Sequence, residues 1–404
     1  MTKVSSPMTI LYQTKMRDID RDELDRIPSK DRATYLDISG FVISIVSHLI
    51  DVILDLNLAY RYYESANVGN FVTTMGFILI PAMINTAFSV RMYVLDSENK
   101  NRHSTLTKKL TKQSICYVIV LIFQLAPVLR YFDALKYSWK SKQAEKNKDP
   151  ENQRKYYELM VKEDSDVALL RVLECFLEAA PQQILQLSII FTSHGMGKLS
   201  TLNIVHQYLS IGSSFVSMAW SMASYQRLLR VSLKNKSNIS WKGTVVQFLW
   251  HVLVTVSRIL CISVMASVYP VSTIAVLMIH WFVMTFWLST SQPNNFCGHN
   301  RFYDFLFFSI FGAVNIFTHV VLVDGPTCCK YTLFYLVLFC ENMAATVVWV
   351  ISADDDLKQT MYFKPIIYAN VIPFLIGIIF MILYYKCFHP STVYRTQPVE
   401  NGTS

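Results

Sequence analysis

Four acidic residues lie inside apolar stretches that are long enough to cross a lipid bilayer. Glu174 and Glu178 share the stretch 167–191, and Asp51 and Asp55 share another. A carboxylate at the centre of a bilayer costs on the order of 3 kcal/mol, so four would cost about 10 kcal/mol, comparable with the whole stability of many proteins. A chain that keeps these acids therefore uses them, either in a structural ion network or along a polar path through the membrane.

The acids of the stretch 167–191 belong to a longer row of polar side chains. Steps of three or four residues place this row on one face of a helix, over roughly 22 Å along the axis. Pro181 lies within the row and predicts a kink, because proline lacks the N–H group and clashes with the preceding turn. The row consists of Arg171, Glu174, Glu178, Gln182 and Gln186.

The other pair of acids lies in the apolar stretch 40–62. His48, Asp51 and Asp55 share one helical face there. An arginine in a later apolar stretch, Arg258, needs an acid or carbonyl oxygens nearby. We expect its partner to be one of the four acids already named.

Two uses of these charged residues are open. In the structural alternative, Arg171 and Arg258 neutralise two of the four acids in a fixed network. In the functional alternative, which we favour, the polar residues line a furrow past which something polar moves. A furrow open to lipid suits phospholipid headgroups, whose acyl chains stay in the bilayer, and a closed one suits ions or small solutes.

The composition predicts an all-α polytopic membrane protein. Of 404 residues, 52% are hydrophobic and 16% are charged, whereas about a quarter of the residues in a soluble domain are charged. Several apolar runs exceed about 18 residues, the length that indicates a transmembrane helix. The net charge of +8 is typical of basic cytosolic loops facing an anionic leaflet and does not indicate nucleic-acid binding.

Loop charges and apolar runs together predict eight spans and two embedded segments. The loops 96–113 and 134–165 hold five and eight Lys or Arg, so both are expected in the cytosol. The run 114–132 between them then re-enters the membrane, unless one basic loop lies outside. The run 271–288 is expected to re-enter as well, and its alternative is a crossing helix. The predicted spans are 40–62, 68–95, 167–191, 202–224, 244–268, 304–324, 329–351 and 365–386.

The predicted membrane domain lies between two polar tails, both expected in the cytosol. The N-terminal tail contains Asp22-Glu23-Leu24-Asp25, the DxxD pattern after which caspases cut. Asp25 is therefore a candidate cleavage site, and the structural alternative is a solvated helical turn. The expected divisions are a tail over 1–39, a membrane domain over 40–386 with candidate halves 40–200 and 201–386, and a tail over 387–404.

Motifs for ATP binding, zinc binding and serine-hydrolase catalysis are absent from the sequence. His and Cys are scattered along apolar helices, where such residues more often belong to a core than to a catalytic site. We therefore expect a passive process with no cofactor, no metal ion and no enzyme activity.

The string Glu-Cys-Phe-Leu-Glu-Ala-Ala-Pro-Gln-Gln, from Glu174 to Gln183, resembles that of the XK-related membrane proteins. Asp51-Val52-Ile53-Leu54-Asp55 is also similar to theirs, and the resemblance extends from about residue 40 to residue 386. It implies eight spans with two embedded helical hairpins. It also implies phospholipid scrambling at the plasma membrane, which exposes phosphatidylserine on dying cells.

The resemblance also implies partners. Some members are activated by caspase cleavage of a cytosolic tail, but the C-terminal tail after Tyr385 contains no Asp. Other members resemble partners of lipid-transfer or surface proteins. The alternative functions are thus a scaffold for a lipid-transfer protein or a single-span subunit, and a transporter or channel. Phe176-Leu177-Glu178 and Phe339-Cys340-Glu341 are alike, which is compatible with a duplicated half.

Overall fold

The computed structural model of the chain describes an assembly of helices. All regular structure in the described residues is helical, as the sequence predicted. The described residues are 32–98, 124–192, 201–232, 238–291, 301–321, 328–353, 355–360 and 363–389.

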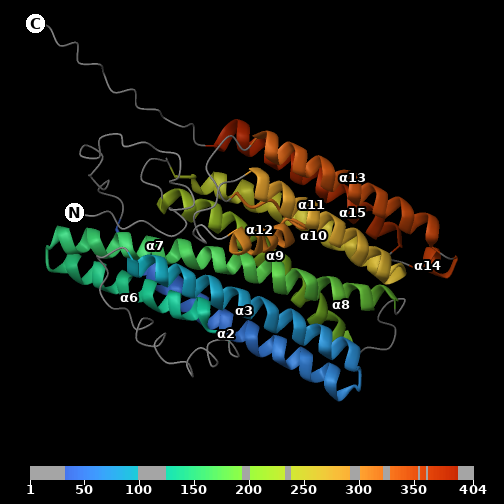
Figure 1. Cartoon of the computed structure of the whole chain (residues 1–404), viewed down its shortest axis with the longest axis horizontal. Coiled ribbons are helices and arrows are strands. Elements are labelled where there is room, and N and C mark those ends of the chain that lie inside the picture. The colour runs from blue at the N-terminus through green and yellow to red at the C-terminus, as the bar shows by residue number, and fades with distance from the viewer. Residues whose placement is uncertain are drawn as a thin grey trace, which may run out of the picture.

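Two kinds of helix occur, α-helices and short π-helices (Figure 1). The α-helices of the first half are α2 (Tyr35–Glu64), α3 (Val68–Glu98), α6 (Ala126–Lys146), α7 (Pro150–Glu174) and α8 (Ala180–Thr192), with the π-helix η1 (Cys175–Ala179) between the last two. Those of the second half are α9 (Thr201–Ser232), α10 (Trp241–Val268), α11 (Pro270–Ser291), α12 (Arg301–Val314), α13 (Cys328–Ser352), α14 (Asp355–Gln359) and α15 (Phe363–Leu383), followed by the π-helix η2 (Tyr384–Phe388).

The helix α2 begins before its apolar stretch does. Thr34 caps α2 by accepting a hydrogen bond from the backbone N–H of Asp37, whose side chain accepts one from Thr34 N in return. This reciprocal capping box fixes the start of the helix at Tyr35, ahead of the boundary at residue 40 that hydropathy predicted.

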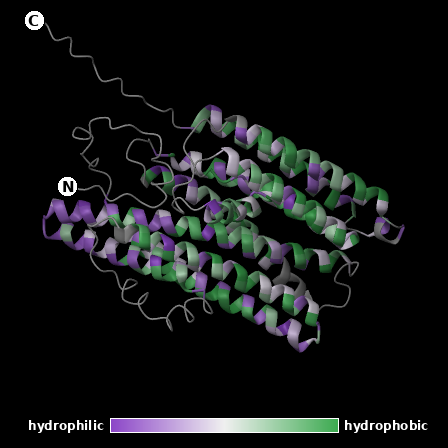
Figure 2. Cartoon of the chain, viewed as in Figure 1, coloured by the Kyte–Doolittle hydropathy of each residue, from purple (hydrophilic) through white to green (hydrophobic). Residues whose placement is uncertain are grey.

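The helices α2, α3, α6 and α7 lie side by side along the long axis of the molecule (Figure 1). The turn between α6 and α7 lies at the hydrophilic end of this group, where the apolar faces stop (Figure 2). Most of the basic loop 134–165 thus belongs to the ends of α6 and α7.

A buried ion cluster joins three of these helices. The NH1 atom of Arg130 donates to Glu163 at 2.9 Å and to Asp166 at 2.8 Å, and its NH2 atom donates to the carbonyl of Ser89 at 3.1 Å. The side chains of Arg130, Glu163 and Asp166 are inaccessible to solvent. Their mutual contacts therefore fix how α3, α6 and α7 lie against one another.

The second half packs around α10, which contacts α8, α9, α11, α13 and α15. The closest approach is to α15 at Gly377, where an added Cβ would lie 2.8 Å from a methyl group of Val254. A glycine at this position allows the two backbones to approach, as is usual for helices that pack inside a membrane.

Six described helices are long and apolar enough to cross a membrane. This supports a multi-pass membrane protein without reproducing the expected eight spans and two re-entrant segments. The six are α2, α3 up to Leu95, α10, α11, α13 from Lys330, and α15 with η2.

The structure favours a different role for two of the predicted segments. The helix α12 has 14 residues, and at 1.5 Å per residue its length of about 21 Å falls short of a ~30 Å bilayer core. The helix α11 has 22 residues and is long enough. Hence α11 fits the crossing alternative for 271–288, and α12 fits an embedded segment. Most of the other predicted re-entrant segment, 114–123, lies outside the described residues.

Candidate intramembrane polar site

Glu174 accepts hydrogen bonds from two helices. Arg171 NH1, one turn earlier on α7, donates to Glu174 Oε1 at 2.9 Å, and His48 Nδ1 on α2 lies 3.2 Å from the same oxygen. Glu174 and His48 are both buried. This contact places the acidic faces of α2 and α7 against each other.

Gln124 connects this pair with the next acid along the helix. Its carbonyl oxygen lies 2.9 Å from His48 Nε2, and its side-chain amide donates to Glu178 Oε1 at 3.0 Å. The residue has φ of 50°, in the left-handed region. This backbone turn, just before α6, aims the carbonyl at one residue and the side chain at another.

The two aspartates of α2 lie beside the glutamates. Asp51 Oδ2 is 3.9 Å from Arg171 NH1, and 48% of its side chain is exposed. Asp55 lies next to Glu178 and Gln182. The face of α2 that carries the acids therefore meets the polar face of η1 and α8.

Acids outnumber cations in this cluster. Glu174 and Glu178 each have one buried carboxylate oxygen without a hydrogen-bond partner, and the amide nitrogen of Gln182 is in the same situation. Arg171 is the guanidinium that contacts Glu174 and Asp51, whereas Glu178 lies beside Asp55. Asp55 and Glu178 share a side-chain hydrogen bond, and when both are ionised they repel in a weakly polar environment, so a cation beside them is favoured.

The π-helix η1 carries Glu178. In it the N–H of Ala180 donates to the carbonyl of Cys175, five residues back. A π-turn widens the helix by one residue and shifts the faces of the turns on either side. Pro181 follows directly, so the interruption is located where the sequence predicted a kink.

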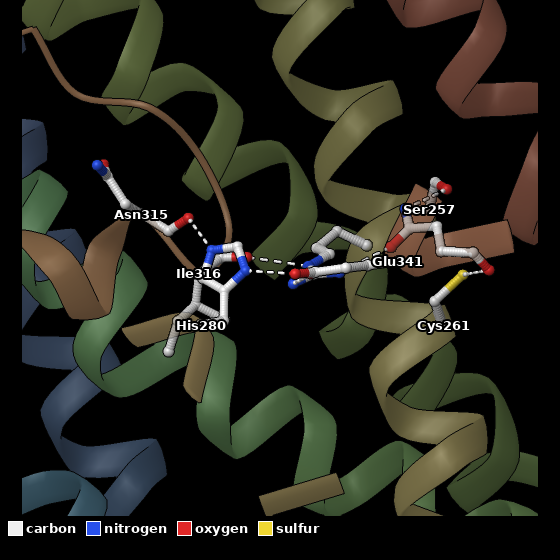
Figure 3. Close-up of polar contacts among 8 residues, drawn as sticks. Ser257, Cys261, His280, Asn315, Ile316 and Glu341 are labelled. Carbon is white, nitrogen blue, oxygen red and sulfur yellow. Dashed lines mark hydrogen bonds and ion pairs between the residues drawn. The ribbon is translucent and has the colours of Figure 1, made fainter. Parts of the chain in front are cut away.

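A second charged cluster lies in the other half, where Figure 3 shows His280 pointing toward Glu341. Arg258 NH2 donates to Glu341 Oε2 at 2.6 Å, its Nε to the carbonyl of Ile316 at 2.9 Å, and its NH1 to Asn342 at 2.9 Å. His280 Nδ1 lies 2.7 Å from the other oxygen of Glu341. Each oxygen of this carboxylate thus has a cationic or hydrogen-bonding neighbour.

The two clusters share a pattern. His48 connects Glu174 with the carbonyl of Gln124, and His280 connects Glu341 with the carbonyl of Asn315, at 3.2 Å. Gln124 lies two residues before the start of α6, and Asn315 directly follows α12. In both places a histidine therefore ties the irregular end of a helix to an acid of a long helix.

Comparison with known proteins identifies the family of this chain. The family model for XK-related proteins matches residues 40–390, which is most of the chain. The chain belongs to the XK-related family. Two curated proteins named "Cell death abnormality protein 8" are similar to it. The one from Caenorhabditis elegans is 27% identical over 91% of this chain and 81% of its own length. The one from Caenorhabditis briggsae is 27% identical over 93% and 82%.

The structure brings together most of the site that the sequence of this XK-related protein predicted. One cluster contains Asp51, Asp55, Arg171, Glu174, Glu178 and Gln182. The candidate caspase site at Asp25 lies outside the described residues. In the described part of the chain, no group of His, Cys, Asp and Glu has the arrangement of a metal site.

The predicted partner of Arg258 was wrong. The expectation named the four acids of the first half, but the guanidinium binds Glu341. The physical reason is that α10 packs against α13, while α2 lies on the far side of α7. Sequence spacing orders residues on one helix and does not tell which helices are neighbours.

Sequence reasoning missed Gln124, His280 and Glu341 as site residues. Gln124 had no periodic signal, since it belongs to an irregular turn. The similarity of Phe339-Cys340-Glu341 to Phe176-Leu177-Glu178 was the one signal for Glu341. Histidine, like arginine, is rare inside membrane helices and usually has a partner there. His280 was therefore a signal in the sequence for an acid nearby.

Proposed function

We propose that this XK-related protein is an ATP-independent phospholipid scramblase. Phospholipid headgroups pass the acidic face that α2 shares with η1 and α8, while the acyl chains remain in the bilayer. The process runs down the lipid gradient and exposes phosphatidylserine at the surface of the plasma membrane.

The observation that carries this proposal is the excess of acid on a lipid-exposed helix. Only 17% of the apolar window of α2 is buried, yet Asp51 and Asp55 lie on it beside partly unpaired Glu174 and Glu178. Choline, ethanolamine and serine headgroups all carry an ammonium group. An acidic face next to lipid therefore attracts the part of the headgroup that is otherwise hardest to bring into the membrane.

The names of the two relatives support a role for the proposed scrambling in cell death. The two nematode proteins are named for abnormal cell death, and dying cells expose phosphatidylserine. We extend this to the chain as a proposal, with a caspase acting at Asp25 as the candidate trigger. A caspase-resistant Asp25→Ala chain is expected to keep phosphatidylserine inside during cell death, which annexin binding at intact cells measures.

The direct test is scrambling by the purified full chain in liposomes. Fluorescent phospholipids are quenched from outside with a membrane-impermeant reductant, and quenching well beyond about half of the signal shows that lipids cross. Asp55→Asn with Glu178→Gln is expected to slow scrambling at least tenfold. Glu64→Gln, at the exposed end of the same helix, serves as the control and is expected to scramble normally.

The other outcomes separate the alternative functions. Full scrambling by the folded double variant would remove the role of the acids. Quenching that stays near half for the intact chain and for a chain lacking residues 1–25 would contradict the scramblase. Co-purification of a lipid-transfer protein or single-span subunit would then support the scaffold, and solute flux without lipid movement would support the transporter.

A further inference from the structure

A cationic junction forms where α9 ends, α10 begins and the chain leaves η2. Phe388 of η2 lies so close to Gly243 of α10 that an added Cβ would be 3.2 Å from the Cβ of Phe388. Arg230 NH2 of α9 lies 3.3 Å from His389 Nδ1, just after η2. Contacts among the three elements therefore hold this junction together.

The junction lies at one surface of the membrane. The membrane-spanning stretch of α10 starts at Trp241, and that of α15 and η2 ends at Phe388. Since Phe388 packs on the first turn of α10, both ends lie at the same depth. Trp241 is 63% exposed, and exposed tryptophans are typical of the boundary between headgroups and water.

Two guanidinium groups of the junction are held in place without an acid among the residues that the structure describes. Arg227 lies over the ring of Trp241, 3.8 Å from its centroid, and donates to Thr244 Oγ1 at 3.3 Å. Arg227 and Arg230 are both half-buried. Between Tyr225 and Leu260, and between Phe363 and His389, the sequence contains no Asp or Glu.

Two further features add positive charge to the same place. Lys242 and Lys386 are exposed and lie on the first turn of α10 and on η2. The N-terminus of α10 carries the positive end of the helix dipole, and Ser240 caps it through the N–H of Gly243 at 3.2 Å. Backbone N–H groups of the first turn and two positioned guanidinium groups form a setting that favours phosphate oxygens.

Arg227 is partly buried, and this burial is consistent with an anion-binding site. Burial lowers the pKa of the Arg227 guanidinium, because removing a cation from water without an acid beside it is unfavourable. An anion at the junction would offset that penalty. Ordinary basic loops carry flexible, fully solvated lysines, whereas here an aromatic ring and a hydroxyl group position the arginine before any ligand arrives.

We propose that this junction binds the phosphorylated headgroup of an anionic phospholipid in the adjoining leaflet. The choice of a lipid rather than a soluble phosphate rests on the depth of the site and on Trp241, whose ring would lie beside the glycerol and acyl region. This binding site is separate from the acidic face of α2 and does not depend on the proposed scrambling.

The test measures binding by the purified full chain in detergent. The probes are short-chain phosphatidylinositol bisphosphate, short-chain phosphatidylcholine and soluble inositol trisphosphate. We expect the phosphoinositide to bind more tightly than the other two probes. Its affinity is expected to fall as the salt concentration rises. Arg227→Gln with Arg230→Gln is expected to lower the affinity for the phosphoinositide roughly tenfold or more. Each cation near an anionic lipid contributes a factor of about ten or slightly less to the affinity.

A matched control removes the same charge at the opposite end of α15. Lys358→Gln with Lys364→Gln changes two exposed lysines there and is expected to leave the affinity unchanged. Should the arginine variant fail to fold, Lys242→Gln with Lys386→Gln replaces two exposed side chains and is also expected to weaken binding. Unchanged affinity in the folded junction variants, or equal loss in the control, would overturn the site. Inositol trisphosphate binding as tightly as the lipid would overturn the lipid assignment.

Discussion

His48 and His280 bind the same kinds of group, but their acids differ in charge balance. Glu341 has Arg258 and His280 as partners, whereas Glu178 has Gln124 and the neighbouring Asp55. A paired buried acid holds a structure together, and an unmatched one is available to a passing cation. The two clusters are therefore expected to respond differently to the same substitution.

Glu341→Gln is expected to lower the free energy of unfolding by about 3 kcal/mol, because it leaves Arg258 buried without its counter-charge. Glu178→Gln is expected to cost much less or to stabilise, because it removes repulsion with Asp55. Thermal unfolding of both purified variants in the same detergent measures the difference. Equal losses would show that the two acids have the same structural role.

Asp164 gives a pH dependence outside the apolar stretch. Burial, and then the nearby charge of Asp37, raises the pKa of Asp164 from 3.8 to about 7. The folded chain thus holds this proton more tightly than the unfolded chain, so the stabilisation is full below about pH 4 and is lost as pH rises to about 7. Asp164→Asn is expected to reduce the fall in melting temperature between about pH 5 and about pH 8. An identical fall in the variant would contradict this.

At the scale of elements, the sequence predicted the long apolar helices because hydropathy and capping act locally. Thr34 and Asp37 show the limit of hydropathy, since a polar capping box lengthened α2. The π-turn was not predictable, because its extra residue depends on how Glu174 and Glu178 meet α2 rather than on local propensity. The partner of Arg258 was missed for the related reason that helix adjacency comes from packing.

Deleting Ala179 tests the π-turn. Removal of one residue allows η1 to become α-helical while α7 and α8 keep their relative faces, because a π-turn holds about one residue more than an α-turn. Glu178, which lies inside the turn, then changes its direction relative to Glu174 and Asp55, so scrambling is expected to slow although the chain still folds. Liposome assay and circular dichroism together measure this. Deleting Ser291, at the end of α11, is the control and should keep activity.

Substitutions in the ion cluster around Arg130 test what stabilises the packing of α6 against α7. Arg130→Met removes the guanidinium that both buried acids, Glu163 and Asp166, contact, and about 3–5 kcal/mol of stability is expected to be lost. Adding Glu163→Gln and Asp166→Asn to the same chain is expected to restore a large part of it. Melting temperatures of the single and triple variants measure both effects, and no rescue in the triple variant would contradict the electrostatic explanation.

At the scale of the whole molecule, helix length favours the crossing alternative for 271–288. If α11 crosses and α12 does not, Val271 and Ser291 lie on opposite sides of the membrane. Val271→Cys and Ser291→Cys are therefore expected to react with a membrane-impermeant maleimide from opposite sides, in chains in which every native cysteine except the buried Cys175 and Cys261 is replaced by serine. Labelling of both from one side would instead support a re-entrant α11.

The short helix α12 also has a consequence for the bilayer itself. A rod of about 21 Å that lies among longer helices leaves several ångströms of hydrocarbon uncovered, and lipids relieve such a mismatch by thinning locally. Phe302 and Phe305 near its start are exposed. A thinner membrane shortens the distance over which any headgroup leaves water, so the protein would lower the barrier by elastic deformation of its surroundings as well as by charge. Lipids with shorter acyl chains should then reduce the difference between the protein and bare membrane.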